Sequence, residues 1–244
     1  MRRIGTVIAA ACLILPGLTG SSFAQPPLGR HADRAFQIRL GGFFLEGGGE
    51  FWDDTERTFT LDDSDFDDVV VGFSLIRSVN NYVEVGFNVD FYAETVLSDY
   101  RRFVDEDGFA IFHDSELSMV PMTVDVRVLP GGRHRIRGPR RVLKPVFYVG
   151  AGAGLNYWEY EEVGDFLDFD EDPPEVVFER FNDEDLAFEV HALAGFELPL
   201  SRRLNLLFEG RYSWFEDDLG EDFEGLGEIE LGGFWVHGGA SFRF

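Results

Sequence analysis

Eight segments of the chain alternate between apolar and polar side chains, and this alternation constrains the fold more than any other feature. A two-residue period is the pattern of a β-strand whose two faces meet different surroundings. Each segment has about the 9–11 residues that a tilted strand needs to cross a bilayer. The segments span residues 35–46, 67–77, 81–93, 117–129, 144–157, 186–198, 204–215 and 230–244.

The large apolar residues share one face of each segment, and the charges fall almost only on the other. In the third segment Val83, Val85 and Phe87 alternate with Glu84 and Asn88. A soluble ligand-binding barrel has the reverse arrangement, with an apolar interior. A polar interior with an apolar exterior is the pattern of a barrel surrounded by lipid. The sequence therefore predicts an all-β fold, an eight-stranded antiparallel up-and-down transmembrane β-barrel.

The connections between the segments alternate in length. Residues 46–68, 94–116, 158–185 and 216–229 are long connections, whereas 77–81 and 199–203 are short and 130–143 is intermediate. Transmembrane barrels have long loops outside the cell and short turns in the periplasm. We therefore expect both chain termini on the periplasmic side.

The first residues have the features of an export signal. Arg2 and Arg3 precede a mostly apolar run over residues 4–15, and Ser22-Phe23-Ala24 offers small residues at the two positions that a signal peptidase reads. We expect residues 1–24 to be a cleaved signal peptide, residues 25–244 to form a single barrel domain, and the mature protein to lie in the cell outer membrane. Cys12, the only cysteine, falls within the predicted signal.

The chain has a net charge of −24, and the charge is segregated along it. Phosphate contacts need Lys and Arg, so this balance argues against nucleic acid as a partner. The long connections hold most of the acid; the third has Arg180 as its one base. Solvation, divalent-cation binding and adaptation to salt are alternative explanations of these acids. Residues 130–143 carry arginines and no acid, as expected of a polar turn or of a contact with anionic headgroups.

The inward faces carry charges of both signs, and these residues are the candidate site. Unpaired charges in a low-dielectric lumen are costly, so we expect a paired, hydrogen-bonded network. Side chains just fill an eight-stranded barrel, which favours a plug over a conducting pore. The predicted lumen network consists of Arg39, Glu84, Asp90, Asp125, Arg127, Glu189, His191, Glu197, Glu209, Arg211, His237 and Arg243.

Catalytic and metal-binding patterns are weak. A lipid A deacylase needs a His and a Ser that face the membrane near the outer rim, with an acid to orient the His. His113 and Ser115 have the spacing, but they lie at a predicted loop, and Glu116 stands where that family has Asn. Two lone histidines do not make a metal site. We expect no catalytic residue, no metal and no cofactor.

Three stretches carry a resemblance to a known family. They are the glycine-rich run at 147–155, the run at 207–212, and the end of the chain, where Val236, Ala240, Phe242 and Phe244 occupy alternate positions. The pattern resembles the small outer-membrane barrels related to the OmpA transmembrane domain and the OmpW-type barrels. The resemblance implies that Phe242 and Phe244 form a signal for the barrel assembly machinery. That family shares a fold and a location but no single activity.

Together these features predict a non-enzymatic outer-membrane barrel with a plugged polar lumen and acidic extracellular loops. Its expected role is envelope structure or surface interaction, as a monomer that contacts outer-membrane lipid, with divalent cations at the acidic loops as a further expected partner. A narrow channel or carrier for small or apolar solutes is the alternative, and a lipid A-modifying enzyme is a third.

Overall fold

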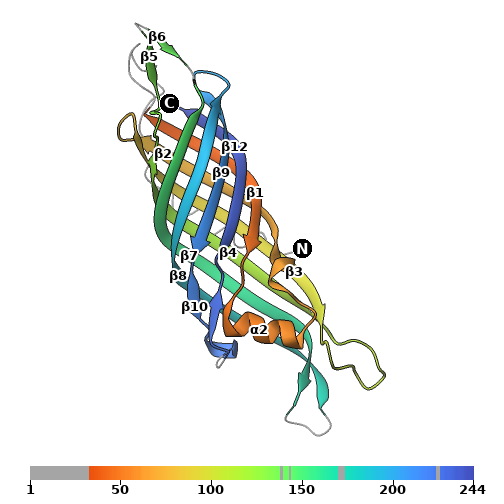
Figure 1. The fold of residues 1–244 in the computed structure, drawn as a ribbon. Coiled ribbons are helices and arrows are strands. Elements are labelled where there is room, and N and C mark those ends of the chain that lie inside the picture. The colour runs from red at the N-terminus through yellow and green to blue at the C-terminus, as the bar shows by residue number, and fades with distance from the viewer. Residues whose placement is uncertain (1–32, 138–139, 143, 170–173, 224–225) are drawn as a thin grey trace, which may run out of the picture. The chain divides into compact units, whose positions relative to one another are not determined.

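A computed structural model describes residues 33–137, 140–142, 144–169, 174–223 and 226–244; the predicted signal peptide lies outside them. Eight antiparallel strands close into a barrel in the order β1-β12-β9-β8-β7-β4-β3-β2 (Figure 1). The expected eight-stranded up-and-down barrel is confirmed. The strands are β1 (Arg34–Leu45), β2 (Asp68–Ser78), β3 (Val83–Asp99), β4 (Phe112–Val128), β7 (Val146–Asp168), β8 (Glu175–Pro199), β9 (Leu204–Trp214) and β12 (Gly233–Arg243).

The two ends of the barrel differ in structure. The end that we call the terminal end holds the start of β1, the end of β12, the short turns 79–82 and 200–203, and the small hairpin of β5 (Arg135–Arg137) and β6 (Arg140–Val142). The opposite end, the capped end, holds the tips of the β3–β4 and β7–β8 hairpins. It also holds the short elements α2 (Gly49–Thr58), η1 (Asp63–Phe66), β10 (Glu216–Asp218), η2 (Glu221–Phe223) and β11 (Glu228–Glu230) (Figure 1).

Helix α2 lies in a segment expected to be a loop. Phe51, Trp52 and Thr55 form its buried face, while Glu50 in the first turn and Arg57 in the last complement the helix dipole. At ten residues it is too short to be stable alone, so packing on the barrel rim holds it. No helix in the described ranges is long and apolar enough to cross a membrane.

Four strands run far beyond their expected ends, so the prediction of loops is wrong for most of residues 158–185 and for about half of residues 94–116. β7 and β8 stay paired from Val146↔Glu197 to Asp168↔Glu175, and β3 pairs with β4 as far as Asp99↔Phe112. The two-residue alternation continues there, but the chemistry of the two faces is exchanged. Inward residues such as Trp158 and Tyr160 are now large and apolar, whereas the outward residues Glu159 and Glu161 are acidic. This exchange is the pattern of a barrel wall surrounded by water.

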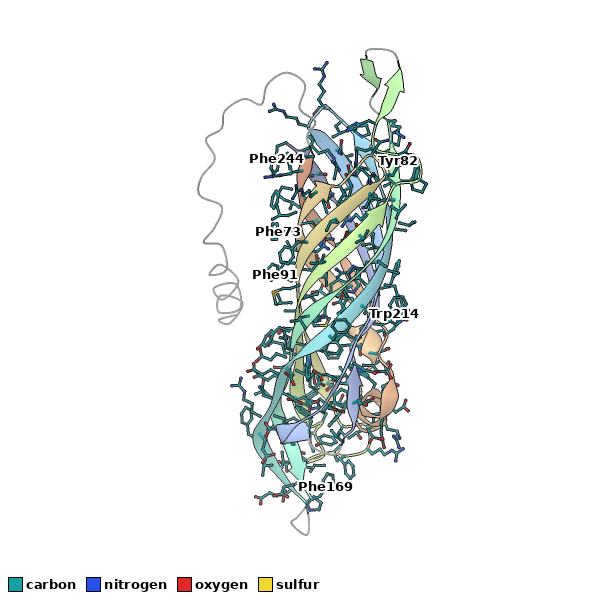
Figure 2. All side chains as sticks on the ribbon, turned by 90° about the vertical axis from the view of Figure 1, so that its left-hand side faces the viewer. Phe73, Tyr82, Phe91, Phe169, Trp214 and Phe244 are labelled. Atoms are coloured by element: carbon teal, nitrogen blue, oxygen red, sulfur yellow. The ribbon has the colours of Figure 1, made fainter. Side chains whose placement is uncertain are left out.

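The outward face of the remaining wall is an apolar belt. Its exposed side chains come from all eight strands and include Leu40, Phe73, Phe87, Val126, Phe147, Phe188, Phe208 and Val236. On β7 the belt ends at Tyr157, and the next outward residues are acidic. Figure 2 shows Phe73 and Phe91 along the wall, and Phe169 far beyond it at the tip of the β7–β8 hairpin. Such a belt, bounded by polar residues, matches the lipid-facing surface of a transmembrane barrel.

Inward glycines allow the first and last strands to approach closely at the seam that closes the barrel. A Cβ at Gly239 would lie 2.1 Å from the carbonyl oxygen of Ile38 on β1, and one at Gly41 would lie 1.8 Å from that of Val236. Gly238, the neighbour of Gly239, faces outward, and the nearest heavy atom to a Cβ at that position would be 3.9 Å away. The seam therefore requires glycine on its inner face.

Gly239→Ala is expected to lower the free energy of unfolding by about 1–3 kcal/mol, because the added methyl must displace the β1 backbone. Gly238→Ala is the matched control, with an expected change below about 0.5 kcal/mol. Urea titration of protein refolded into vesicles, followed by tryptophan fluorescence, measures both. Equal unfolding midpoints for the two variants would contradict the close approach.

Candidate functional site in the barrel lumen

A cluster of buried ion pairs lies across the middle of the lumen. Asp90 on β3 accepts hydrogen bonds from Arg39 Nη2 on β1 and Arg211 Nη1 on β9, each at 2.7 Å. Glu209 on β9 accepts from Arg39 Nη1 at 2.9 Å, and its Oε2 lies 3.2 Å from Arg127 Nη1. All five side chains are at most 1% exposed. Each guanidinium therefore has a carboxylate partner.

Two further groups complete this central cluster. Asp125 on β4 binds Arg127 Nε at 2.9 Å. Tyr148 on β7 donates to Glu209 Oε2 at 2.9 Å, and its ring lies 5.0 Å from the Arg127 guanidinium carbon. The cluster joins β1, β3, β4, β7 and β9. Because charged hydrogen bonds are the stronger ones, such a network ties the walls of the barrel together.

A second cluster closes on the terminal end. Glu84 on β3 and Glu197 on β8 share two arginines, Arg243 on β12 and Arg133 from the turn after β4. Arg133 Nη1 lies 2.6 Å from Glu197 Oε2, and Arg133 Nε donates to Glu84 Oε1 at 3.0 Å. Arg133 was expected in an exposed basic turn, so that expectation is wrong for this residue. Two inward carboxylates draw its side chain into the lumen.

The other predicted lumen residues lie nearer the capped end. Glu189 accepts a hydrogen bond from Asn156 Nδ2 at 3.3 Å, and His191 Nδ1 lies 3.4 Å from Glu189 Oε1. His237 Nε2 lies 3.7 Å from Asp90 Oδ1. Each of the twelve predicted residues lies at ion-pair distance from another member of the set. For Glu189 that member is His191, and for the other eleven it is an Arg, Asp or Glu.

An apolar cluster, the cap core, fills the lumen at the capped end. The inward-facing side chains of the extended strands pack there against α2, η1, η2 and β11. Trp235 links it to the charges, because its ring lies 4.2 Å from Phe43 and 4.3 Å from the Arg211 guanidinium carbon. The buried members are Phe43, Leu45, Phe51, Trp52, Leu61, Phe66, Val70, Tyr92, Leu117, Met119, Trp158, Tyr160, Ala187, Phe215, Leu219, Phe223, Ile229, Leu231 and Trp235.

The expectation of a polar interior is therefore wrong for the capped end. The predicted network omitted Gln37, Tyr148 and Arg133. The strand period puts Gln37 and Tyr148 on inward faces, so both could have been included in it. No strand period applies to Arg133, which lies in a turn. Phe242 and Phe244 are exposed on the outer face, as their alternation predicted.

His113 and Ser115 lie within β4 rather than in a loop, and both are buried. The His113 ring forms its hydrogen bond with Ser98 Oγ, 2.9 Å away, rather than with Ser115, and it packs against Phe59 and Phe166. Burial lowers the pKa of His113 to about 4, which keeps the ring neutral. Among the residues that the structure describes, its Nδ1 has no hydrogen-bond partner, so no acid there orients this Ser–His pair. A buried pair without an orienting acid lacks the geometry of a hydrolase site.

Glu162 is a buried carboxylate in the extension of β7, beyond the apolar belt. Tyr160 Oη donates to its Oε1 at 2.8 Å, but no cation neutralises it among the described residues. Burial raises the pKa of Glu162 from 4.5 to about 7. The folded extension therefore binds a proton on Glu162 at pH values where the unfolded chain has released it.

The opening free energy of this extension is expected to fall as the pH rises from about 4.5 to about 7, by on the order of 1–3 kcal/mol. Glu162→Gln, which mimics the protonated acid, is expected to flatten this dependence. Hydrogen exchange of the 158–168 amides, corrected for intrinsic rates, measures the free energy of opening at each pH. Glu175→Gln removes an exposed carboxylate from β8 and should retain the wild-type profile. A profile unchanged in Glu162→Gln would assign the titration to another group.

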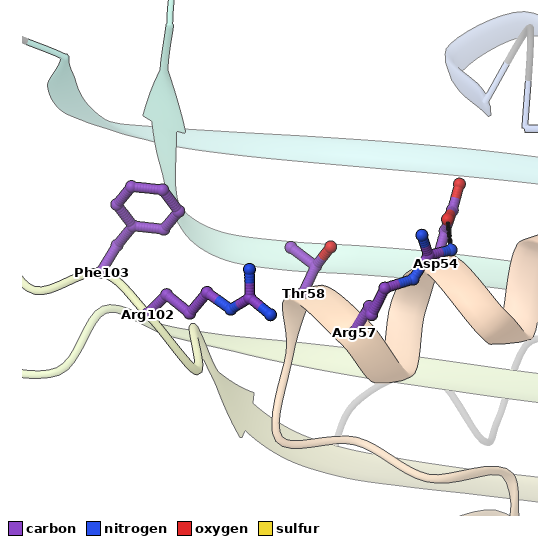
Figure 3. A pocket seen from close by; sticks show the side chains of 5 residues that line it. All are labelled: Asp54, Arg57, Thr58, Arg102 and Phe103. Atoms are coloured by element: carbon purple, nitrogen blue, oxygen red, sulfur yellow. Dashed lines mark hydrogen bonds and ion pairs between the residues drawn. The ribbon is translucent and has the colours of Figure 1, made fainter.

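A shallow pocket on the capped end offers little chemistry. It is lined by Asp54, Arg57, Thr58, Arg102 and Phe103, and Arg57 forms an ion pair with Asp54 there (Figure 3). In the part of the chain that the structure describes, no three His, Cys, Asp or Glu side chains are placed to hold a metal ion. The lumen clusters are thus the most extensive polar sites in the described barrel.

No protein-family model matches this sequence, and no curated protein matches it. Solved structures of outer-membrane barrels are similar. The outer membrane protein OprG from Pseudomonas aeruginosa has a TM-score of 0.47 at 12% identity, covering 86% of this chain and 95% of that one. Neisserial surface protein A has a TM-score of 0.46 at 9% identity, covering 88% and 98%. A major outer membrane protein of Thermus thermophilus has a TM-score of 0.44 at 12% identity, covering 86% and 99%.

Proposed function

We propose that this chain is a monomeric outer-membrane barrel with the capped end outside the cell and the terminal end in the periplasm. The apolar belt supports the membrane placement. The orientation is supported by the short turns at the terminal end and the long hairpins at the capped end. Heat-dependent gel mobility and protease treatment of intact cells test the placement; purification as a soluble monomer without detergent would overturn it.

The lumen of this barrel is proposed to be closed, and its filling by side chains is the observation that carries the proposal. The cluster of Glu84, Glu197, Arg133 and Arg243 occupies the terminal end. The central cluster around Asp90 occupies the middle, and the cap core occupies the capped end. An eight-stranded barrel is only wide enough for side chains to fill. Three successive layers then leave no path for solutes.

If the lumen is closed, the capped end is the part of the barrel that can contact other molecules outside the membrane. Its hairpins are paired strands on a packed core, so they present their acidic outward residues on a rigid frame. We therefore favour a non-enzymatic role in envelope structure or in contact with a partner at the cell surface. The buried Ser98–His113 pair supports the non-enzymatic proposal, because a substrate has no access to it. Phe242 and Phe244 remain the proposed assembly signal.

Planar-bilayer recording of the refolded protein tests the closed lumen. The expected result is a flat baseline without regular conductance steps. Double substitution of Arg133 and Arg243 by alanine removes the terminal layer and is expected to leave the other two layers sealed. Steady single-channel steps from the wild-type protein would overturn the closed lumen and establish the alternative, a narrow channel.

A further inference from the structure

The register of β1 and β2 places two arginines opposite each other on the outer wall. Arg34 pairs with Arg77 at the terminal end of both strands. Arg34 shares its outward face with Phe36 and Ile38, and Arg77 shares its face with Phe73 and Leu75. Both arginines are exposed. The two guanidinium groups therefore extend from neighbouring positions on one face of the sheet.

Neither arginine has an acidic partner in the part of the chain that the structure describes. Among the described residues neither side chain makes an ion pair or a hydrogen bond. Asp33 precedes Arg34 without pairing with either guanidinium, and Phe244 meets Arg34 through backbone hydrogen bonds at 3.0 and 3.4 Å. Like charges directly opposite each other destabilise a sheet. An anion held between the two groups would remove this repulsion.

The position of the pair identifies the surface on which that anion would lie. Directly beside it begins the apolar belt, where Phe36 stacks on Phe73 with ring centroids 6.2 Å apart. Tyr82 and Phe244 are 56% and 61% exposed, and Figure 2 shows them toward the same end of the barrel. Exposed aromatic residues at the edge of an apolar belt mark the level of lipid headgroups.

The charge of the terminal end fits an anionic headgroup. Arg202 and Arg203 are exposed in the turn after β8, and the sequence places Arg135, Arg137, Arg140 and Arg141 in the β5–β6 hairpin. Asp33 is an exposed acid at this end, whereas Glu84 and Glu197 are buried and paired. An anionic membrane surface attracts such a group of cations.

We propose that Arg34 and Arg77 clamp the phosphate of an anionic phospholipid, of the phosphatidylglycerol type, in the leaflet at the terminal end. Guanidinium groups bind phosphate oxygens through paired hydrogen bonds. The acyl chains then lie along Phe36, Phe73 and Leu75. The proposal rests on the membrane placement proposed above and adds the class of lipid and its binding residues.

Native mass spectrometry of the detergent-solubilised mature protein, with equal amounts of phosphatidylglycerol and phosphatidylcholine, tests the clamp. The wild type is expected to retain phosphatidylglycerol selectively. Arg34→Gln/Arg77→Gln is expected to lose roughly thirty-fold in that preference, on the order expected for two cations at a lipid surface. Arg202→Gln/Arg203→Gln removes the same charge at the same end and should change it less than about three-fold. Inorganic phosphate alone is expected to bind too weakly to survive transfer to the gas phase.

The clamp would be overturned by equal retention of both lipids by the wild type, or by equal losses in the two double variants. Retention of inorganic phosphate in place of lipid would also overturn it. If Arg34→Gln/Arg77→Gln does not fold, Arg34→Lys/Arg77→Lys takes its place in the comparison with the wild type. The lysine variant keeps both charges and should show part of the wild-type preference for phosphatidylglycerol. Normal heat-dependent gel mobility without lipid preference would reject the clamp alone, whereas absence of membrane insertion would reject the placement.

Discussion

Replacing Asp90 with alanine is expected to lower the free energy of unfolding of the barrel by about 3–5 kcal/mol. Asp90 is fully buried and accepts hydrogen bonds from Arg39 and Arg211. Its removal leaves Arg211 Nη1 without its carboxylate partner and Arg39 with Glu209 alone. When a buried cation loses its partner, no interaction offsets the free energy that it costs to remove the cation from water. Urea titration of protein refolded into vesicles measures the loss through tryptophan fluorescence.

Asp114→Ala is the matched control, because Asp114 is exposed on the outer face of β4. Its expected effect is within about 0.5 kcal/mol. Asp90→Asn keeps the shape of the side chain but not its charge, and should cost nearly as much as Asp90→Ala. A small effect of Asp90→Asn would mean that hydrogen bonding rather than charge holds the two arginines.

Replacing Trp235 with alanine is expected to cost about 3–5 kcal/mol, because the indole is fully buried where the cap core meets the charges. It packs on Phe43 and lies under the Arg211 guanidinium, and its Nε1 donates to Ser213 Oγ at 2.8 Å. The variant loses all three contacts and gains a cavity. The same urea titration, read by circular dichroism because a fluorophore is lost, measures the change.

Trp214→Ala is the control for Trp235→Ala. Trp214 is 50% exposed on the outer face of β9, so its truncation leaves no internal cavity. We expect it to cost less than half as much as Trp235→Ala. Equal losses would mean that contact with lipid, rather than internal packing, dominates the contribution of tryptophan in this barrel.

The barrel wall was predictable because one physical rule determines its sequence. Each strand meets lipid on one face and a narrow polar lumen on the other, so a strict two-residue period marks every crossing. The predicted start of β1 and end of β9 each lie within one residue of the observed position. The inward charges of Asp90 and Arg211 followed from the same period.

The capped end was not predictable by that rule, because it follows the opposite one. Trp158 faces inward and Glu159 outward, as in a water-soluble strand, so a search for lipid-facing residues ends too early. Helix α2 has an acidic sequence that resembles a loop, and its helical form depends on the packing of Phe51 and Trp52. Arg133 reaches Glu84 and Glu197 from a turn, and only the folded structure shows that contact.

The exchange of faces beyond Tyr157 gives β7 and β8 two different sets of tolerated mutations. Within the belt, an outward residue that becomes charged meets lipid, so selection keeps those positions apolar. Beyond the belt the outward residues are acidic, and Glu161 there pairs with Arg180, while Trp158 and Tyr160 pack inside the hairpin. Outward residues at the capped end can therefore change without loss of the inward packing that supports the hairpin.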